Sequence, residues 1–278
     1  MAIMILVVGA VAIDMIAVRE KFLEGTSNPS DIKLALGGVG YRIFSNLDAP
    51  KRFITALGAD PISQWARQAL EADGDVALQT VKGGDAGPPL YLALMESGSL
   101  KVAASDFRIV EQSLSADFVI SRLGDIGQGD FLVLDANLSP RLLADLARRY
   151  ADRTRLVFEP VSVEKALRHV EALHDLYLLT PTVEELRSLT SDVHAFMAER
   201  RILNILVTRG SEGAQLYRRE GGQEDFPPSA VVRAQDTTGA GDLLLAALLS
   251  RLHAGEEMAA AVRGAMSFVE GRLQRGAL

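Results

Sequence analysis

Two acids and a glycine-rich turn stand together near the end of the sequence. Residues 236–242 read D-T-T-G-A-G-D, and the apolar run L-L-L-A-A-L-L follows directly. A turn of small residues that opens a helix leaves backbone N–H groups unpaired, and the helix dipole makes them a site for an anion. An acid there repels the anion unless it accepts a proton from an attacking hydroxyl. The pattern indicates phosphoryl transfer, with Asp242 as the base and Gly239, Ala240 and Gly241 as the anion hole.

A plainer interpretation of the same turn is structural. Aspartate is common at helix starts, so Asp242 alone could be a helix cap. Asp236 could cap as well, however, and a second acid beside an anion site then has no structural purpose. We therefore favour the chemical interpretation of the turn.

The elements that must position this turn alternate regularly through the second half of the chain. Apolar strand-like runs are followed by amphipathic helical runs, which predicts βαβ units and a parallel sheet covered by helices. The predicted strands are 131–136, 155–160, 176–180 and 202–208. A first buried strand is predicted at Ile3–Val8. Ligands of such sheets bind outside the carboxyl ends of the strands.

Two stretches interrupt this alternation. Residues 15–36 contain a turn between two extended runs, and residues 90–105 are typical of a hairpin around Glu96, Ser97 and Gly98. Four short strands from these two insertions would make one small sheet, either a lid over the strand ends or a dimerisation surface. The alternative is two unrelated surface hairpins. We expect residues 1–278 to form a single domain.

The composition narrows the class of protein. The chain has 278 residues, 48% hydrophobic and 23% charged, with a net charge of −7. This acidity argues against a nucleic-acid polymer as partner, although backbone dipoles can still hold phosphates. The absence of cysteine excludes thiolate catalysis, disulfides and Cys-ligated metals. The apolar N-terminal run is too short to span a bilayer and has no basic segment before it, so we expect a cytoplasmic protein that acts on small molecules.

Two common nucleotide motifs are absent from the sequence. There is no G-x-x-x-x-G-K-[ST] phosphate loop, and no G-x-G-x-x-G follows the first strand. The second absence sets aside a dinucleotide-dependent oxidoreductase. Phosphoryl transfer, if present, must use a different nucleotide site.

Several motifs together resemble the ribokinase, or phosphofructokinase-B, family of sugar and nucleoside kinases. In chain order they are VVGAVAID (7–14), LGGVG (36–40), ITALGAD (54–60), TPTVEE (180–185), VTRGSEG (207–213) and DTTGAGD. The resemblance implies a three-layer α/β/α sandwich with a mainly parallel central sheet and a small β-sheet lid. Within the family, GGVGYRIFSNL and YLALMESGSLKVAASD are most similar to pseudouridine kinases.

The resemblance also implies site residues, cofactors and partners. The acceptor, a sugar or nucleoside, would be held by Asp14, Gly37, Gly38, Arg42 and Asn137. The ATP site would include Thr208, Gly210, Gly213 and Thr238. Glu185 would organise Mg²⁺ through water, and Asp236 would contribute to a site for a monovalent cation such as K⁺. The lid is also the expected surface of a homodimer.

The sequence departs from the family pattern on the acceptor side. Arg42 and Ala12 stand where the family has asparagine, Tyr41 where pseudouridine kinases have arginine, and Thr182 replaces the asparagine of the T-P-N-x-x-E motif. Arginine cannot accept hydrogen bonds and suits a carboxylate or phosphate. Three alternatives stay open: a pseudouridine-like acceptor, an anionic acceptor bound by Arg42, or an Arg42–Asp14 pair that blocks the site. The last would suit a non-catalytic protein that binds nucleotide or sugar as a sensor or scaffold.

Overall fold

The computed structural model describes residues 4–83, 87–229 and 239–275. In this part of the chain the centre is a nine-stranded sheet of order β13-β12-β11-β10-β9-β8-β1-β4-β5. Neighbours from β11 to β5 run parallel, and β12 and β13 are antiparallel at one edge. The strands are β1 (Ile5–Val8), β4 (Lys51–Gly58), β5 (Val76–Val81), β8 (Phe131–Asp135), β9 (Arg155–Glu159), β10 (Leu178–Leu179), β11 (Asn204–Thr208), β12 (Ala214–Arg218) and β13 (Gln223–Phe226).

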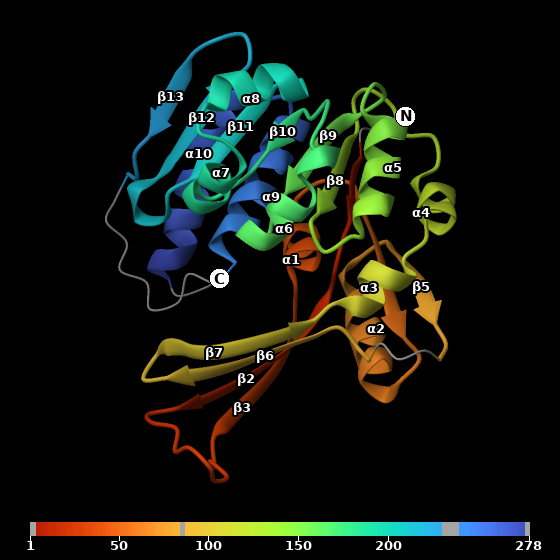
Figure 1. Cartoon of the computed structure of the whole chain (residues 1–278), viewed down its shortest axis with the longest axis vertical. Helices are drawn as coiled ribbons and strands as arrows, with labels where there is room; N and C mark the ends of the chain where they lie inside the picture. The colour runs from red at the N-terminus through yellow and green to blue at the C-terminus, as the bar shows by residue number, and fades with distance from the viewer. Residues whose placement is uncertain (1–3, 84–86, 230–238, 276–278) are drawn as a thin grey trace.

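Helices cover both faces of this sheet (Figure 1). Side chains of β1 alternate between two cores, with Ile5 and Val7 in one and Leu6 and Val8 in the other. One core includes α1 (Val39–Asn46), α2 (Pro61–Asp73), α9 (Ala240–His253) and α10 (Met258–Gln274). The other includes α3 (Arg108–Ser113), α4 (Ala116–Leu123), α5 (Pro140–Tyr150), α7 (Val183–Leu189) and α8 (Val193–Arg200). The short helix α6 (Val163–Arg168) contacts α7. The predicted three-layer α/β/α class is confirmed.

A second, four-stranded sheet of order β3-β2-β6-β7 projects from one end of the molecule (Figure 1). Its strands are β2 (Ala12–Arg19), β3 (Asp31–Gly37), β6 (Leu90–Glu96) and β7 (Ser99–Asp106). The two insertions therefore pair, through a parallel β2–β6 ladder. The predicted hairpin joins β6 and β7, and Ser97 and Gly98 at its tip both have positive φ, as the tight turn requires.

The strand order locates the site. In the large sheet β1 has β4 as its neighbour toward one edge and β8 as its neighbour toward the other edge. The strand order therefore reverses direction at β1, which makes β1 a switch point. A crevice at such a switch point binds ligands in open α/β sheets. The small sheet starts at Ala12, four residues beyond the end of β1 at Val8, so its first strand begins beside this crevice. No helix within the described ranges is long and apolar enough to cross a membrane.

Candidate active site

The start of α9 forms one wall of the candidate site. Gly239 caps the helix in the left-handed conformation, with φ 83°, and its carbonyl accepts the N–H of Leu243 at 2.9 Å. The N–H groups of the first turn, including Ala240 and Gly241, have no intrahelical partner. A Cβ at Gly241 would meet nothing within 4 Å. Packing therefore does not require glycine there, and the open space leaves room for an anionic ligand.

Asp242 lies in this first turn, and only 9% of its surface is exposed. Burial raises the pKa of the Asp242 carboxyl to about 7, while Arg42 lowers it and Asp135 raises it by smaller amounts. A carboxyl that titrates near neutral pH is well matched to accept a proton in that range.

Arg42, on α1, stands between two carboxylates. Its Nη2 lies 2.7 Å from Oδ2 of Asp14, and its Nη1 lies 4.0 Å from Oδ2 of Asp242. Asp14 is 3% exposed, and burial raises the pKa of its carboxyl while Arg42 lowers it. Of the alternatives left by the sequence, the pairing of Arg42 with Asp14 is present in this structure.

The glycine pair before α1 lets the chain pass close to β2. A Cβ at Gly37 would clash with the Asp14 carboxylate. Gly38 has φ 88°, and a Cβ there would lie 2.7 Å from the backbone nitrogen of Ala12. These contacts bring Arg42, one turn further on, to Asp14. They explain both glycines by packing alone, so their contact with an acceptor stays a prediction.

Asp135 is a buried residue of the site that the sequence did not single out. It ends β8, has 0% exposure, and accepts the backbone N–H groups of Ala10 at 2.9 Å, Gly40 at 3.0 Å and Asn137 at 2.9 Å. Burial raises the pKa of its carboxyl, although these hydrogen bonds oppose the shift. Asp135 thereby ties the end of β1 and the start of α1 to the end of β8. An acid at the end of an otherwise apolar strand was the available signal.

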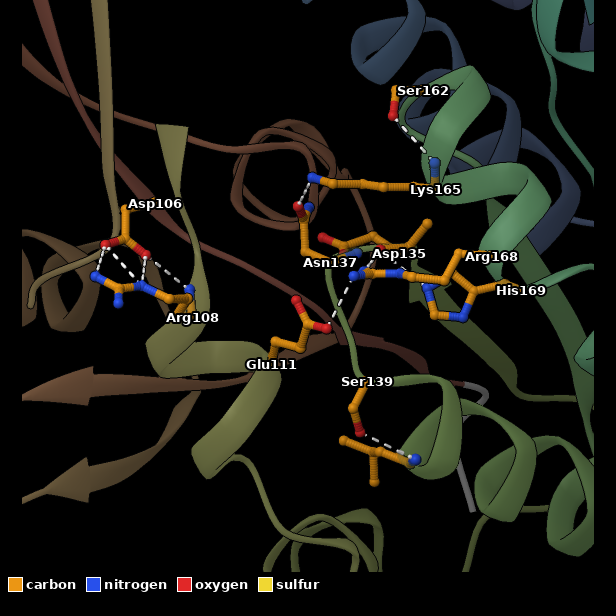
Figure 2. Close-up of polar contacts among 12 residues, drawn as sticks. Asp106, Arg108, Glu111, Asp135, Asn137, Ser139, Ser162, Lys165, Arg168 and His169 are labelled. Atoms are coloured by element: carbon orange, nitrogen blue, oxygen red, sulfur yellow. Dashed lines mark hydrogen bonds and ion pairs between the residues drawn. The ribbon is translucent and has the colours of Figure 1, made fainter. Parts of the chain in front are cut away.

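Asn137 lies near the same strand end but is only 2% exposed. Its Oδ1 accepts a hydrogen bond from Lys165 on α6 (Figure 2). Its backbone N–H donates to Asp135 Oδ1, so the residue is held from two sides. The predicted role of Asn137 in holding the acceptor is untested, and Lys165 is a second residue that the sequence did not indicate.

Glu185 forms a capping box with Thr182 at the start of α7. The Thr182 N–H donates to Glu185 Oε2 at 2.8 Å, and the Glu185 N–H donates to Thr182 Oγ1 at 3.3 Å. Glu185 is 5% exposed, and burial raises the pKa of its carboxyl. Thr182, where the family has asparagine, therefore still supports the acid. A further acid, Glu159, has a pKa well above the usual range, because of burial first and then the charges of Asp242 and Glu185.

A groove of about 920 Å³ lies between the β11–β12 hairpin and the start of α9. It brings together predicted nucleotide and catalytic residues, namely Thr208, Gly210, Gly213, Ala240 and Gly241. Its apolar lining comes from Leu244, Met266, Val269 and Leu273. The groove therefore joins the predicted triphosphate end to an apolar surface of the kind that holds a nucleobase. The predictions for Asp236 and Thr238 lie outside the described residues.

The sequence model of the pfkB family of carbohydrate kinases matches residues 2–268 of the chain. The chain therefore belongs to this family. It is similar to pseudouridine kinase of Escherichia coli (strain K12), with 24% identity over 274 residues that cover 93% of this chain and 87% of that protein. The protein is thus a phosphotransferase of the sugar and nucleoside kinase type.

Solved structures support the same fold. Ribokinase of Thermotoga maritima has a TM-score of 0.82 at 19% identity, covering 99% of this chain and 94% of its own. Arabidopsis thaliana ribokinase complexed with ribose and ATP has a TM-score of 0.79 at 19% identity, covering 100% and 95%. At this identity the likeness shows the ribokinase-like fold alone.

Proposed function

We propose that the protein transfers the γ-phosphoryl group of MgATP to a hydroxyl of a sugar or nucleoside. The observation that carries the proposal is Asp242, a buried carboxyl whose pKa is raised to about 7, in the first turn of a helix whose residues Ala240 and Gly241 line an open groove. Asp242 would remove the hydroxyl proton as the oxygen attacks phosphorus. The N–H groups of residues 239–241 would bind the charge on the transferring phosphoryl.

The donor side would bind ATP along the groove, with Thr208, Gly210 and Gly213 near the phosphates. Among the residues that the structure describes, no group of three or more acids or histidines could hold a metal ion alone. This fits Mg²⁺, which is usually held by one or two carboxylates together with water and substrate phosphates. Glu185 would supply such a carboxylate through water. Asp236 would assist a monovalent cation, K⁺.

On the acceptor side, Asp14, Gly37, Gly38, Arg42 and Asn137 would hold a cytoplasmic small molecule. A pseudouridine-like nucleoside is the first candidate, because the curated relative that covers nearly the whole chain is a pseudouridine kinase. An anionic sugar is the second candidate, favoured by the Arg42–Asp14 pair. A neutral acceptor that needs Asp14 must displace Arg42, whereas a carboxylate or phosphate would give Arg42 a new partner.

The small sheet would serve as the lid over this acceptor and as the surface of a homodimer. Its opposite faces support these two roles. Asp14 lies on one face, whereas the other face carries rows of apolar side chains that are partly exposed, among them Ile32, Leu34 and Leu92. An exposed apolar face on a projecting sheet favours a partner, and we infer a second copy of this chain.

A phosphorylation assay by mass spectrometry tests the function, with MgATP, K⁺, pseudouridine, other nucleosides, ribose and acidic sugars. Wild-type product on any of these, reduced ~10²–10⁴-fold in Asp242→Asn with ATP binding retained, is the expected result. Full activity of that variant would sink the assignment. ATP binding without product on any acceptor would instead favour the non-catalytic sensor or scaffold.

A further inference from the structure

One acidic side chain lies on the face of α10 that lines the groove. The groove residues of this helix have the spacing i, i+3, i+4 and i+7 of a single helical face, namely Met266, Val269, Glu270 and Leu273. α9 continues this wall with Leu244, because the two helices pack side by side (Figure 1). Within the described part of the chain, Glu270 is the one charge on this wall. Neither the sequence motifs nor the proposed chemistry uses it.

The Glu270 carboxylate is held in place by Ser229, in the segment that follows β13. The backbone N–H of Ser229 donates to Oε1 of Glu270 at 2.9 Å, and the Ser229 hydroxyl donates to Oε2. Glu270 is partly buried, and no lysine, arginine or histidine among the described residues forms an ion pair with it. The two oxygens of a carboxylate have about four lone-pair sites, so Glu270 can accept further hydrogen bonds.

A fixed carboxylate in an apolar wall selects a nucleobase by its N–H donors. An ionised carboxyl group accepts hydrogen bonds and donates none. A base edge that presents an N–H group is therefore bound, whereas an edge that presents only acceptors is rejected, because the buried acceptor then has no donor. The apolar side chains around Glu270 contact the faces of any base equally well, so they do not make this distinction.

The contact with Ser229 favours adenine over guanine. Guanine presents a ring N–H and an amine side by side, which together bind both oxygens of a carboxylate as a fork. Ser229 already donates to both oxygens of Glu270, so this mode of binding is taken. Adenine presents a single exocyclic amine, which needs only one of the remaining lone pairs.

We propose that Glu270 is a nucleobase-specificity residue, whose carboxylate accepts a hydrogen bond from the exocyclic amine of adenine. This inference rests on the proposed function and assigns the base end of its nucleotide. Ser229 acts through Glu270 and is a positioning residue, because its two hydrogen bonds fix the direction in which the carboxylate points.

The test compares the binding of ATP, purine riboside triphosphate and GTP by calorimetry, with Mg²⁺ and without an acceptor. Purine riboside triphosphate is ATP without its amine, so the ring system, ribose and phosphates are unchanged. Wild type should bind ATP ~10- to 100-fold more tightly than purine riboside triphosphate, the range for a hydrogen bond to a charged group. It should also bind ATP more tightly than GTP. Glu270→Met, which extends the apolar wall, should bind ATP no more tightly than purine riboside triphosphate, and the latter no more weakly than wild type does.

Glu212→Met is the matched control, since Glu212 is an acid that lines the same groove at the β11–β12 hairpin. This variant should keep the wild-type ratio of the ATP and purine riboside triphosphate affinities. Loss of that ratio in both variants would overturn the inference. Equal weakening of both nucleotides in Glu270→Met would overturn it as well, because Glu270 would then be a structural support of the Ser229 segment.

The comparison of nucleotides in wild type needs no variant, so the inference stays testable if Glu270→Met does not fold. Equal affinity of wild type for ATP and purine riboside triphosphate would overturn the inference alone, provided that ATP still phosphorylates an acceptor. A wild-type protein that binds none of the three nucleotides would overturn both this inference and the proposed kinase function.

Discussion

At the scale of single residues, the charge on Asp242 sets the pH range of the proposed reaction. A general base must be ionised before it can accept a proton, and burial raises the pKa of Asp242 to about 7. We therefore expect kcat/KM for the acceptor to fall about tenfold per pH unit below that pKa. A pH profile at saturating MgATP measures this limb. A profile that stays flat well into the acidic range would contradict the role of Asp242.

Removing the charge of Arg42 should shift the acidic side of this pH profile. Its guanidinium lies 4.0 Å from Asp242 and lowers the pKa of that carboxyl, so Arg42→Gln should raise the pKa and move the acidic limb to higher pH. Arg52→Gln is a matched control. Arg52 forms an ion pair with Asp75 away from the site, at 2.7 Å, the same distance as between Arg42 and Asp14. If both variants keep the wild-type limb, Arg42 does not act on Asp242.

Glu185 is predicted to have two separable roles, in the capping box and in the use of Mg²⁺. Glu185→Gln keeps a side-chain oxygen for the Thr182 N–H, so stability should change little while the Mg²⁺ concentration needed for activity rises. Thr182→Ala should do the reverse, since losing a cap costs ~1 kcal/mol of unfolding free energy. Urea unfolding and Mg²⁺ titration at fixed ATP measure the two effects. The separation fails if both variants change the same quantity.

At the scale of elements, the β11–β12 hairpin should respond very differently to substitution of its two glycines. Both have positive φ, 56° at Gly210 and 92° at Gly213. A Cβ at Gly210 would meet nothing within 4 Å, whereas one at Gly213 would clash with the carbonyl oxygen of Phe226 in β13. Gly210→Ala should cost ~1–2 kcal/mol, from backbone conformation alone.

Gly213→Ala should cost more, upward of ~3 kcal/mol, because β13 must also move. It should also weaken ATP binding, since the hairpin lines the groove. Urea unfolding with and without ATP distinguishes the two variants. Equal costs would mean that the hairpin relaxes around the new side chain.

The elements themselves were largely predictable from the sequence, because their signals are local. From residue 131 onward, apolar runs that alternate with amphipathic runs predicted strands that the structure contains. The turn at Ser97 and Gly98 likewise predicted the hairpin of β6 and β7. Asp135 was not predictable in this way, because its partner Ala10 is 125 positions away and the contact exists only after folding. Lys165 was missed because a lysine on a helix is usually solvated, and its sequence position alone does not reveal that it is partly buried. The Arg42–Asp14 pair was foreseen only as one of several alternatives.

At the scale of the whole molecule, the small sheet has a face that is unusually apolar for a surface. Cross-strand partners share a face, and one such face contains the row Leu34, Met15, Leu92 and Ala104 and the row Ile32, Ala17, Leu94 and Val102. Ile32 is 69% exposed, Leu92 47% and Val102 53%. Packing this face against that of a second copy would remove these side chains from water without covering Asp14, which lies on the opposite face.

We therefore expect a homodimer that a single charge in the middle of this face disrupts. Leu92→Lys would bury an ammonium twice in the symmetric interface, which costs several kcal/mol and should raise the dimer dissociation constant by more than ~100-fold. Leu203→Lys is the control, because Leu203 is also exposed, at 38%, but lies outside the small sheet. Sedimentation over a range of concentrations should give a dimer for wild type and the control, and a monomer for Leu92→Lys. A wild-type protein that stays monomeric at high concentration would mean that the apolar face has another purpose, since nothing else in the proposal requires two copies.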